Sequence, residues 1–327
     1  RQLRRALDLR FSRAILNFPE TPADSQPPMI LQNPWWAKPF EIFSGLLGTP
    51  GSAEADPSRI LAVMVPLLFG YMFGDLGQGF VLLLAGLLLQ KRWPLLRILV
   101  VNGASAMIFG LVFGSMFGRE DLIPALWVHP VDQPLPVLAV PMVAGVLIIM
   151  LGLILNAIES SWRGEWLRWL QVDAPVVLLY VGIISAFFID SSVSLPLIVS
   201  ALTWYLIGHL LLASGHVLAM LTSLATLIET MMQLLLNTVS FVRVGAFALA
   251  HAGLSLAFNI MADSTGSLPA MLLVLLLGNI IVIVLEGLVV SIQTTRLVLF
   301  EFFIRFLQAN GRVFKPLIGP VSGVTNS

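Results

Sequence analysis

Two ionisable side chains, Arg243 and His251, lie in a stretch from Asn237 to Ser255 that is otherwise almost entirely apolar. An ionisable residue at the middle of a membrane-spanning helix costs about 2.5–3.5 kcal/mol, and such residues usually mark a path for ions or substrates. An arginine keeps its proton in proteins, so Arg243 cannot itself relay protons. A fixed cation in a low-dielectric wall can instead force a passing carboxyl group to ionise.

Further polar groups gather in the last two apolar segments of the chain. They are Glu229, Gln233, Arg243 and His251 in the seventh segment, 217–262, and Glu286, Gln293, Arg296 and Glu301 in the eighth, 268–309. At about 100° per helical residue, Glu229 lies about 40° from Arg243, and Glu286, Gln293 and Arg296 share a face about 80° wide.

The face of the seventh segment that carries Arg243 otherwise presents small side chains. These are Ala246, Ala250, Gly253 and Ala257. Small residues let another helix come close, so a partner helix could approach the guanidinium group.

Two interpretations of these charges stay open at this point. Arg243 and Arg296 either line a functional path or pair with Glu229 and Glu286 as structural ion pairs inside a bundle. His251, about 80° from Arg243 on the helix surface, is either part of the path or a hydrogen-bond donor in helix packing.

The composition is that of an integral membrane protein. Of 327 residues, 57% are hydrophobic and 11% are charged, against about 25% charged in soluble domains. The formal net charge of zero gives a nucleic-acid partner no electrostatic support. Without cysteine, a disulfide or a cysteine metal site is excluded. We find no Walker loop, zinc motif or catalytic triad, and we expect no cofactor, no metal and no catalytic site of its own.

Eight apolar segments predict an all-α integral membrane protein with about eight transmembrane helices. The first six segments cover 59–73, 76–90, 95–118, 135–158, 173–189 and 194–213. We expect residues 1–57 to form a linker at the end of a missing cytosolic N-terminal arm, with Asp56 as the N-cap of the first span. Residues 58–317 form the membrane domain and residues 318–327 a C-terminal tail.

The last two segments are too long for upright spans. A helix over 217–262 would be about 69 Å long, against a hydrocarbon core of about 30 Å. It must tilt steeply, break or project into water, and the absence of an internal proline disfavours a sharp break. We therefore expect the last two helices to be very long and tilted.

The distribution of basic residues orients the chain. With eight spans and a cytoplasmic N-terminus, the only basic residue in the opposite loops is Arg119. The cytoplasmic segments carry Lys91, Arg92, Arg97, Arg163, Arg168, Arg305, Arg312 and Lys315. This asymmetry predicts that both termini face the cytoplasm.

The sequence "SFVRVGAFALAHAGLS" resembles the arginine-containing helix of subunit a of V-type rotary ATPases, called subunit I in bacterial and archaeal V/A-type enzymes. Further segments, "DPSRILAVMVPLLFGYMFGDLGQG", "LEGLVVSIQTTRLVLFEFF" and "GRVFKPL", resemble the same family in the same order. The resemblance covers roughly residues 30–317. It implies eight spans, two long tilted helices against a proteolipid ring, and two offset half-channels.

The resemblance also assigns roles. Arg243 is similar to the essential ring-facing arginine, and the polar positions of the same two helices complete the expected ion-translocation site. The residues of this site are Arg243, Glu229, Glu286, Arg296, Gln293 and His251.

The chain departs from the family pattern at four positions. Gly245 and Phe247 replace commoner residues after the arginine, Gln78 stands where histidine is usual, and Gln293 stands where some members have histidine. These departures leave open whether the ion is a proton or sodium.

The sequence thus predicts a membrane stator subunit of a V/A-type rotary ATPase. The implied partners are the proteolipid c/K ring, the peripheral-stalk and central-stalk-associated subunits, and the lipid bilayer, with a bacterial inner membrane as the expected location. A stand-alone secondary ion transporter and a purely structural membrane anchor are the alternatives, and the absence of an internal repeat weakens the first.

Overall fold

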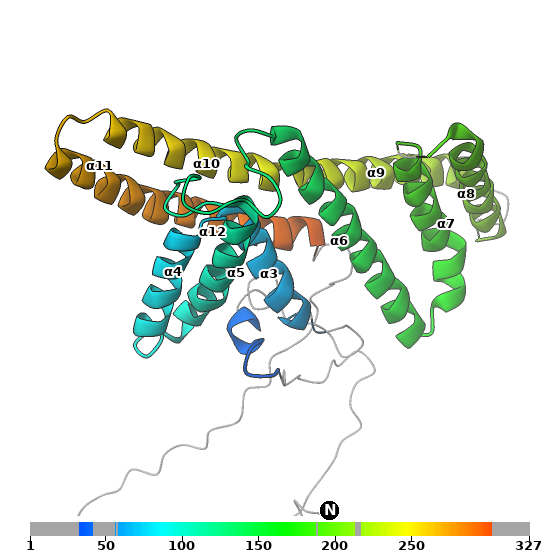
Figure 1. The fold of residues 1–327 in the computed structure, drawn as a ribbon. Coiled ribbons are helices and arrows are strands. Elements are labelled where there is room, and N and C mark those ends of the chain that lie inside the picture. Colours follow the sequence, from blue (N-terminus) through cyan, green and yellow to red (C-terminus); the bar gives the residue numbers. More distant parts are fainter. Residues whose placement is uncertain (1–32, 42–55, 57, 188, 213–216, 303–327) are drawn as a thin grey trace, which may run out of the picture.

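The computed structural model describes residues 33–41, 56, 58–187, 189–212 and 217–302, and its helices follow the predicted apolar segments closely (Figure 1). The helices are α3 (Ser58–Met72), α4 (Leu76–Leu89), α5 (Arg97–Phe113), α6 (Pro134–Trp162), α7 (Trp166–Ser185), α8 (Ser191–Leu212), α9 (Val217–Ser240), α10 (Val242–Asp263), α11 (Leu268–Ile281) and α12 (Gly287–Leu297). No β-strand forms within the described residues, so the predicted all-α class is confirmed. Most of residues 1–57 and the tail 318–327 lie outside the described part.

Among the residues that the structure describes, six helical stretches are long and apolar enough to cross a membrane. Helices α3 and α4 are apolar but have only 15 and 14 residues, which gives them a length of about 22 Å. Large apolar side chains are exposed around most helices, as expected for helices that contact lipid on their outer faces. The chain is therefore an all-α integral membrane protein.

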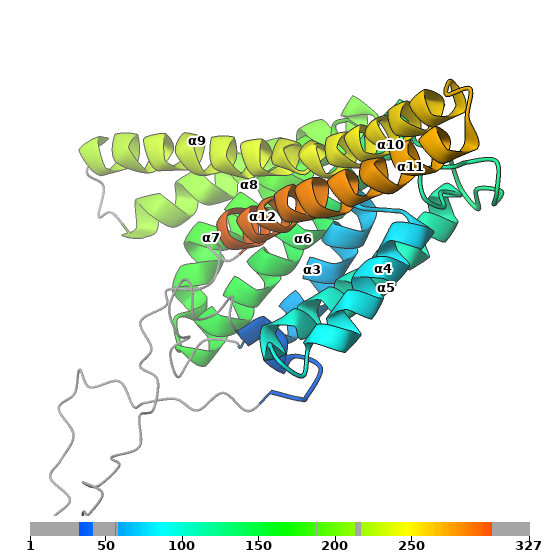
Figure 2. The same ribbon diagram turned by 90° about the vertical axis from the view of Figure 1, so that its left-hand side faces the viewer.

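Two long helical rods dominate the architecture. Helices α9 and α10 follow one another with a single-residue interruption at Phe241 and only a gentle bend (Figure 1). The second rod, α11 with α12, runs beside α10 in both views, and α3 to α7 lie on one side of the pair (Figure 2). The prediction of two very long helices without a sharp break is confirmed.

The second rod contains two π-helical turns, Val282–Glu286 and Val298–Phe302. A π-turn changes the rotation of the side chains that follow it, and such turns are frequent at functional sites. Neither turn was expected from the sequence.

Helix α6 crosses the first rod next to Arg243. A Cβ atom on Gly245 would lie 2.9 Å from the Cα of Leu138 and closer still to the carbonyl oxygen of Val137. A Cβ atom on Gly145 of α6 would lie 2.7 Å from the Cβ of Phe241. The two glycines thus allow the helix backbones to come close, which explains the departure from the family pattern at Gly245.

The same crossing uses a carbonyl group that a proline leaves free. Pro141 has no N–H to bond the carbonyl of Val137, four residues earlier in α6. The Tyr71 hydroxyl of α3 donates to that oxygen at 2.9 Å. This hydrogen bond ties α3 to the helix crossing.

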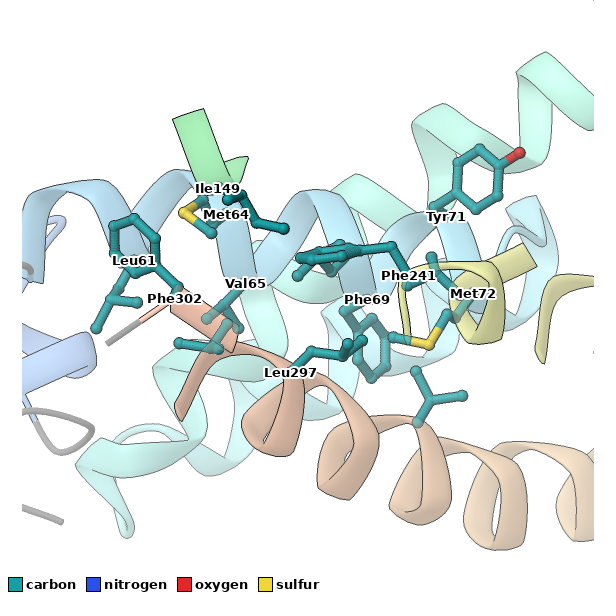
Figure 3. Packing of buried hydrophobic residues seen from close by; sticks show 14 of the residues in the cluster. Leu61, Met64, Val65, Phe69, Tyr71, Met72, Ile149, Phe241, Leu297 and Phe302 are labelled. Atoms are coloured by element: carbon teal, nitrogen blue, oxygen red, sulfur yellow. The ribbon is translucent and has the colours of Figure 1, made fainter. Parts of the chain in front are cut away.

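Helix α3 is at the centre of the packing and contacts α5, α10 and α12. Its apolar side chains meet Ile149 of α6, Phe241, Leu297 and Phe302 in one buried cluster (Figure 3). Phe241 and Phe302 are almost fully buried. The cluster fixes the two long rods against each other at the level of Arg243.

Candidate ion-translocation site

Arg243 lies in the first turn of α10, directly after the interruption at Phe241. Its side chain is half-buried, and its Nη1 atom is buried without a hydrogen-bond partner among the described residues. A buried guanidinium N–H that lacks an acceptor costs about 1–3 kcal/mol. The site is therefore suited to receive an acceptor from outside the described part of the chain.

The predicted face of small residues beside Arg243 is open. Ala246, Ala250, Gly253 and Ala257 are all exposed, and a Cβ atom on Gly253 would meet nothing within 4 Å. The opposite face of α10 packs closely against α6, whereas this face has room for another helix.

His251 and Glu286 form a buried pair between the two rods. His251 Nδ1 and Glu286 Oε2 are 2.5 Å apart, and the two side chains are only 4% and 14% exposed. The first π-turn carries Glu286. The ring of Phe73 lies 4.5 Å from the His251 ring, centroid to centroid. The structure thus brings together two of the predicted site residues.

Glu301, in the second rod, is a second buried polar group. Its partner Ser240 precedes Arg243 in the chain, whereas His251 follows it. The Ser240 hydroxyl donates to Glu301 Oε1 at 2.7 Å, and Glu301 Oε2 is buried without a partner among the described residues. The guanidinium groups of Arg243 and Arg296 are near enough to interact electrostatically with this carboxyl group.

Glu301 was not among the predicted site residues, although it was recognised as a polar group of the eighth segment. On an ideal α-helix it lies about 140° from Arg296, away from the polar face. The second π-turn, Val298–Phe302, changes the rotation of the helix, so ideal α-helical spacing does not hold at Glu301. The available signal was an acidic residue in an apolar run, which is costly unless it has a role.

Glu229 is remote from Arg243. It is exposed on α9, accepts a hydrogen bond from Gln233 at 3.3 Å, and precedes Arg243 by about 21 Å along the helix. Among the described residues, neither Arg243 nor Arg296 forms an ion pair with Glu229 or Glu286. The structure therefore does not form the ion pairs that the structural alternative requires.

Gln293 and Arg296 lie on α12. Gln293 is half-buried, with a buried Oε1 that no described residue hydrogen-bonds, whereas Arg296 is exposed. Within the described residues, no three His, Asp or Glu side chains gather as a metal site would require.

Asp75, at the start of α4, organises the loop that connects α5 to α6. Its fully buried carboxylate accepts hydrogen bonds from the backbone of Gln78, Phe117 and Gly118 and from the Ser115 hydroxyl. Gly118 has a φ of +72°, and a Cβ atom there would lie 2.5 Å from the Cβ of Ser255 in α10. The loop therefore packs directly on the arginine-bearing helix.

Two further contacts fix the same end of the helices. Arg119 Nη2 lies 2.8 Å from Asp263 Oδ1 at the end of α10. The Gln78 side chain donates to Asn279 Oδ1 of α11 at 2.9 Å. Three of the loops predicted to face away from the cytoplasm thus lie together at one end of the protein.

No protein-family model matches the chain. The chain is 29% identical over 313 residues to "A-type ATP synthase subunit I" of Pyrococcus horikoshii, and the matched region covers 88% of this chain and 47% of that protein. The corresponding values for the subunit of the same name are 26% over 351 residues in Aeropyrum pernix, with 87% and 50% covered. For Saccharolobus solfataricus they are 27% over 387 residues, with 91% and 55% covered.

These relatives limit two of the predictions. The chain spans about half the length of the curated relatives it matches. All three are archaeal, so they give no support to the predicted bacterial location. The predicted resemblance itself is confirmed: over most of its length, this integral membrane chain is similar to the subunit I of A-type ATP synthases.

Proposed function

We propose that this chain is the membrane stator subunit of a rotary ATPase of the V/A type, and that it conducts ions, taken here as protons, across the membrane against a rotating proteolipid ring. The observation that carries the proposal is Arg243, whose guanidinium has a buried N–H with no partner in the described part of the chain, beside an exposed face of small residues. The similarity to proteins named A-type ATP synthase subunit I supports it. ATP chemistry takes place in other subunits of the complex.

The unpartnered guanidinium suits a carboxyl group on an approaching ring helix. A carboxylate there satisfies the buried N–H, and the positive charge of Arg243 favours its ionised form. The ring carboxyl group therefore releases its proton as it reaches Arg243 and takes up another after it has passed. The arginine cannot give up its own proton, so it separates the two exchange steps.

The polar groups on either side of Arg243 suit two half-channels that do not meet. His251 follows Arg243 by about 12 Å along α10, and Ser240 precedes it by about 4.5 Å. The pair of His251 and Glu286 serves the half-channel toward the loop end. Glu301 serves the opposite half-channel.

Three further predicted residues belong to this opposite half-channel. They are Glu229, Gln293 and Arg296. A water-filled path to these groups avoids the desolvation penalty that a closed lattice of charges would carry.

The orientation of the chain completes the proposal. Both termini face the cytoplasm, since nearly all the basic residues of the loops then lie on that side. Peripheral-stalk and central-stalk-associated subunits bind on this side.

Cross-linking tests the proposed partner. In the assembled complex, a cysteine at Ala250, on the small-residue face, should cross-link to a cysteine-bearing ring subunit. A cysteine at Leu147, which is 65% exposed on α6, is the control and should not. A stand-alone secondary transporter gives no ring cross-link and does not purify with a ring of small subunits. That result would refute the proposed function.

A further inference from the structure

A narrow crevice leads from the α5–α6 loop to His251. Its lining includes Glu120 and Ser115 of the loop and His251 of α10. It has room for about one water molecule. The buried histidine of the site is thus next to a small opening on the loop side that also contains a carboxyl group.

Buried polar atoms near this crevice lack protein partners. His251 Nε2 and Ser255 Oγ are both buried and without a hydrogen bond among the described residues. Such atoms in native proteins are usually bonded to ordered water. The tautomer in which His251 Nδ1 donates to Glu286 leaves Nε2 free to accept a proton from that side.

Glu120 is the carboxyl group of this opening. It is half-buried, and its Oε2 lies 3.7 Å from His129 Nδ1, a distance at which a water bridge rather than a direct hydrogen bond connects two groups. Burial raises the pKa of Glu120, the nearby His129 lowers it, and the carboxylates of Asp132 and Asp121 raise it. Of the other charged groups at the loop end, Arg119 and Asp263 are paired with each other. The buried Asp75 carboxylate accepts hydrogen bonds from Gln78, Ser115, Phe117 and Gly118.

We propose that Glu120 is the entry group of the half-channel on the loop side, where it collects protons from the outer solution and exchanges them with His251 through water in the crevice. The carboxylate takes a proton from hydronium in the outer solution. The proton then passes to crevice water and from it to His251 Nε2, which leaves an imidazolium beside the Glu286 carboxylate. Return along the same route regenerates both groups. The inference rests on the proposed function, because it assumes that His251 and Glu286 exchange protons with the ring.

The test compares two neighbouring carboxyl groups in the complete complex, reconstituted into vesicles. Glu120→Gln removes the charge at the crevice, and Asp121→Asn removes one from an exposed side chain outside the crevice lining. We expect Glu120→Gln to slow ATP-driven proton transport about tenfold, at the low end of the range by which a charged cleft raises local cation concentration. Its dependence on the pH of the loop-side solution should also change. Asp121→Asn should keep the parent rate and shift that dependence only slightly toward lower pH, because the Asp121 carboxylate helps to raise the pKa of Glu120.

A cysteine at Glu120 gives a second, reversible form of the test, because the chain contains no other cysteine. Modification by a negatively charged thiol reagent from the loop side should restore transport, whereas a positively charged reagent of similar size should not. Normal rate and pH dependence of Glu120→Gln would overturn the inference, as would equal losses in Asp121→Asn. If Arg243→Ala is inactive while Glu120→Gln is normal, only this inference fails. If Arg243→Ala still transports, the proposed function fails.

Discussion

The close crossing of α6 and α10 predicts that Gly245→Ala damages ion transport without touching any charged group. The added methyl group would lie 2.9 Å from the Cα of Leu138, whereas ordinary contacts begin at 3.4 Å. It would come closer still to the carbonyl oxygen of Val137. Both neighbours are backbone atoms, so no side chain can turn aside, and the two helices must move apart by at least about 0.5 Å.

This movement has two measurable consequences. Overpacking of a well-packed contact costs about 1–3 kcal/mol of stability. Arg243 is two residues from the contact and moves with α10, and a misplacement of about 1 Å at a reacting group lowers a rate by about a hundredfold. We therefore expect transport to fall between about tenfold and a hundredfold in complexes that assemble.

The assay is proton uptake per assembled complex in vesicles, together with the thermal stability of the purified complex. Gly266→Ala is the matched control, because a Cβ atom at Gly266 meets nothing within 4 Å. Parent-like transport and stability in Gly245→Ala would refute the reasoning from the helix crossing.

Three further perturbations test other parts of the account. Asp75→Asn removes the charge that four donors share, and we expect the complex to lose about 3 kcal/mol of stability. The measurement is the melting temperature of the complex, which should fall in Asp75→Asn and stay at the parent value in the control Asp121→Asn. A cysteine at Ser264 should react with an impermeant thiol reagent added from the non-cytoplasmic side, and one at Gln90 should not; the reverse pattern would overturn the proposed topology. Glu286→Gln should slow transport strongly in normally assembled complexes, whereas an effect through failed assembly alone would favour a structural role.

The sequence predicted the helices well because their signal is local. Apolar runs bounded by charged or turn residues placed the ends of most helices within a few residues. The missing internal proline correctly indicated that no sharp break occurs near Phe241. Helical spacing alone placed Ala246, Ala250, Gly253 and Ala257 on the face of Arg243, and the structure shows that these four residues are exposed. Arg243 was recognisable because an arginine in such a run is rare and costly.

The contacts between helices were less predictable. Helical spacing placed Glu229 close to the face of Arg243 in angle. The two residues are nevertheless far apart along the helix axis, because fourteen positions separate them in the chain. The pairing of His251 with Glu286, and the buried position of Glu301, depend on how the two rods lie against each other and on π-turns with no clear sequence signal. The sequence shows Gly245 only as a departure from the family pattern, and its reason, the close backbone of α6, is visible only in the fold.

In the proposed function, Arg243 is the cation which ionises each arriving ring carboxyl group. The most direct measurement is ATP-driven proton transport by complexes that carry Arg243→Lys or Arg243→Ala, with Arg97→Lys, at an exposed arginine of α5, as the control. The account predicts that both Arg243 variants assemble but lose coupled transport, because an ammonium group lacks the reach and planar charge of the guanidinium. Coupled transport at the parent rate by a correctly assembled Arg243→Ala complex would contradict the account.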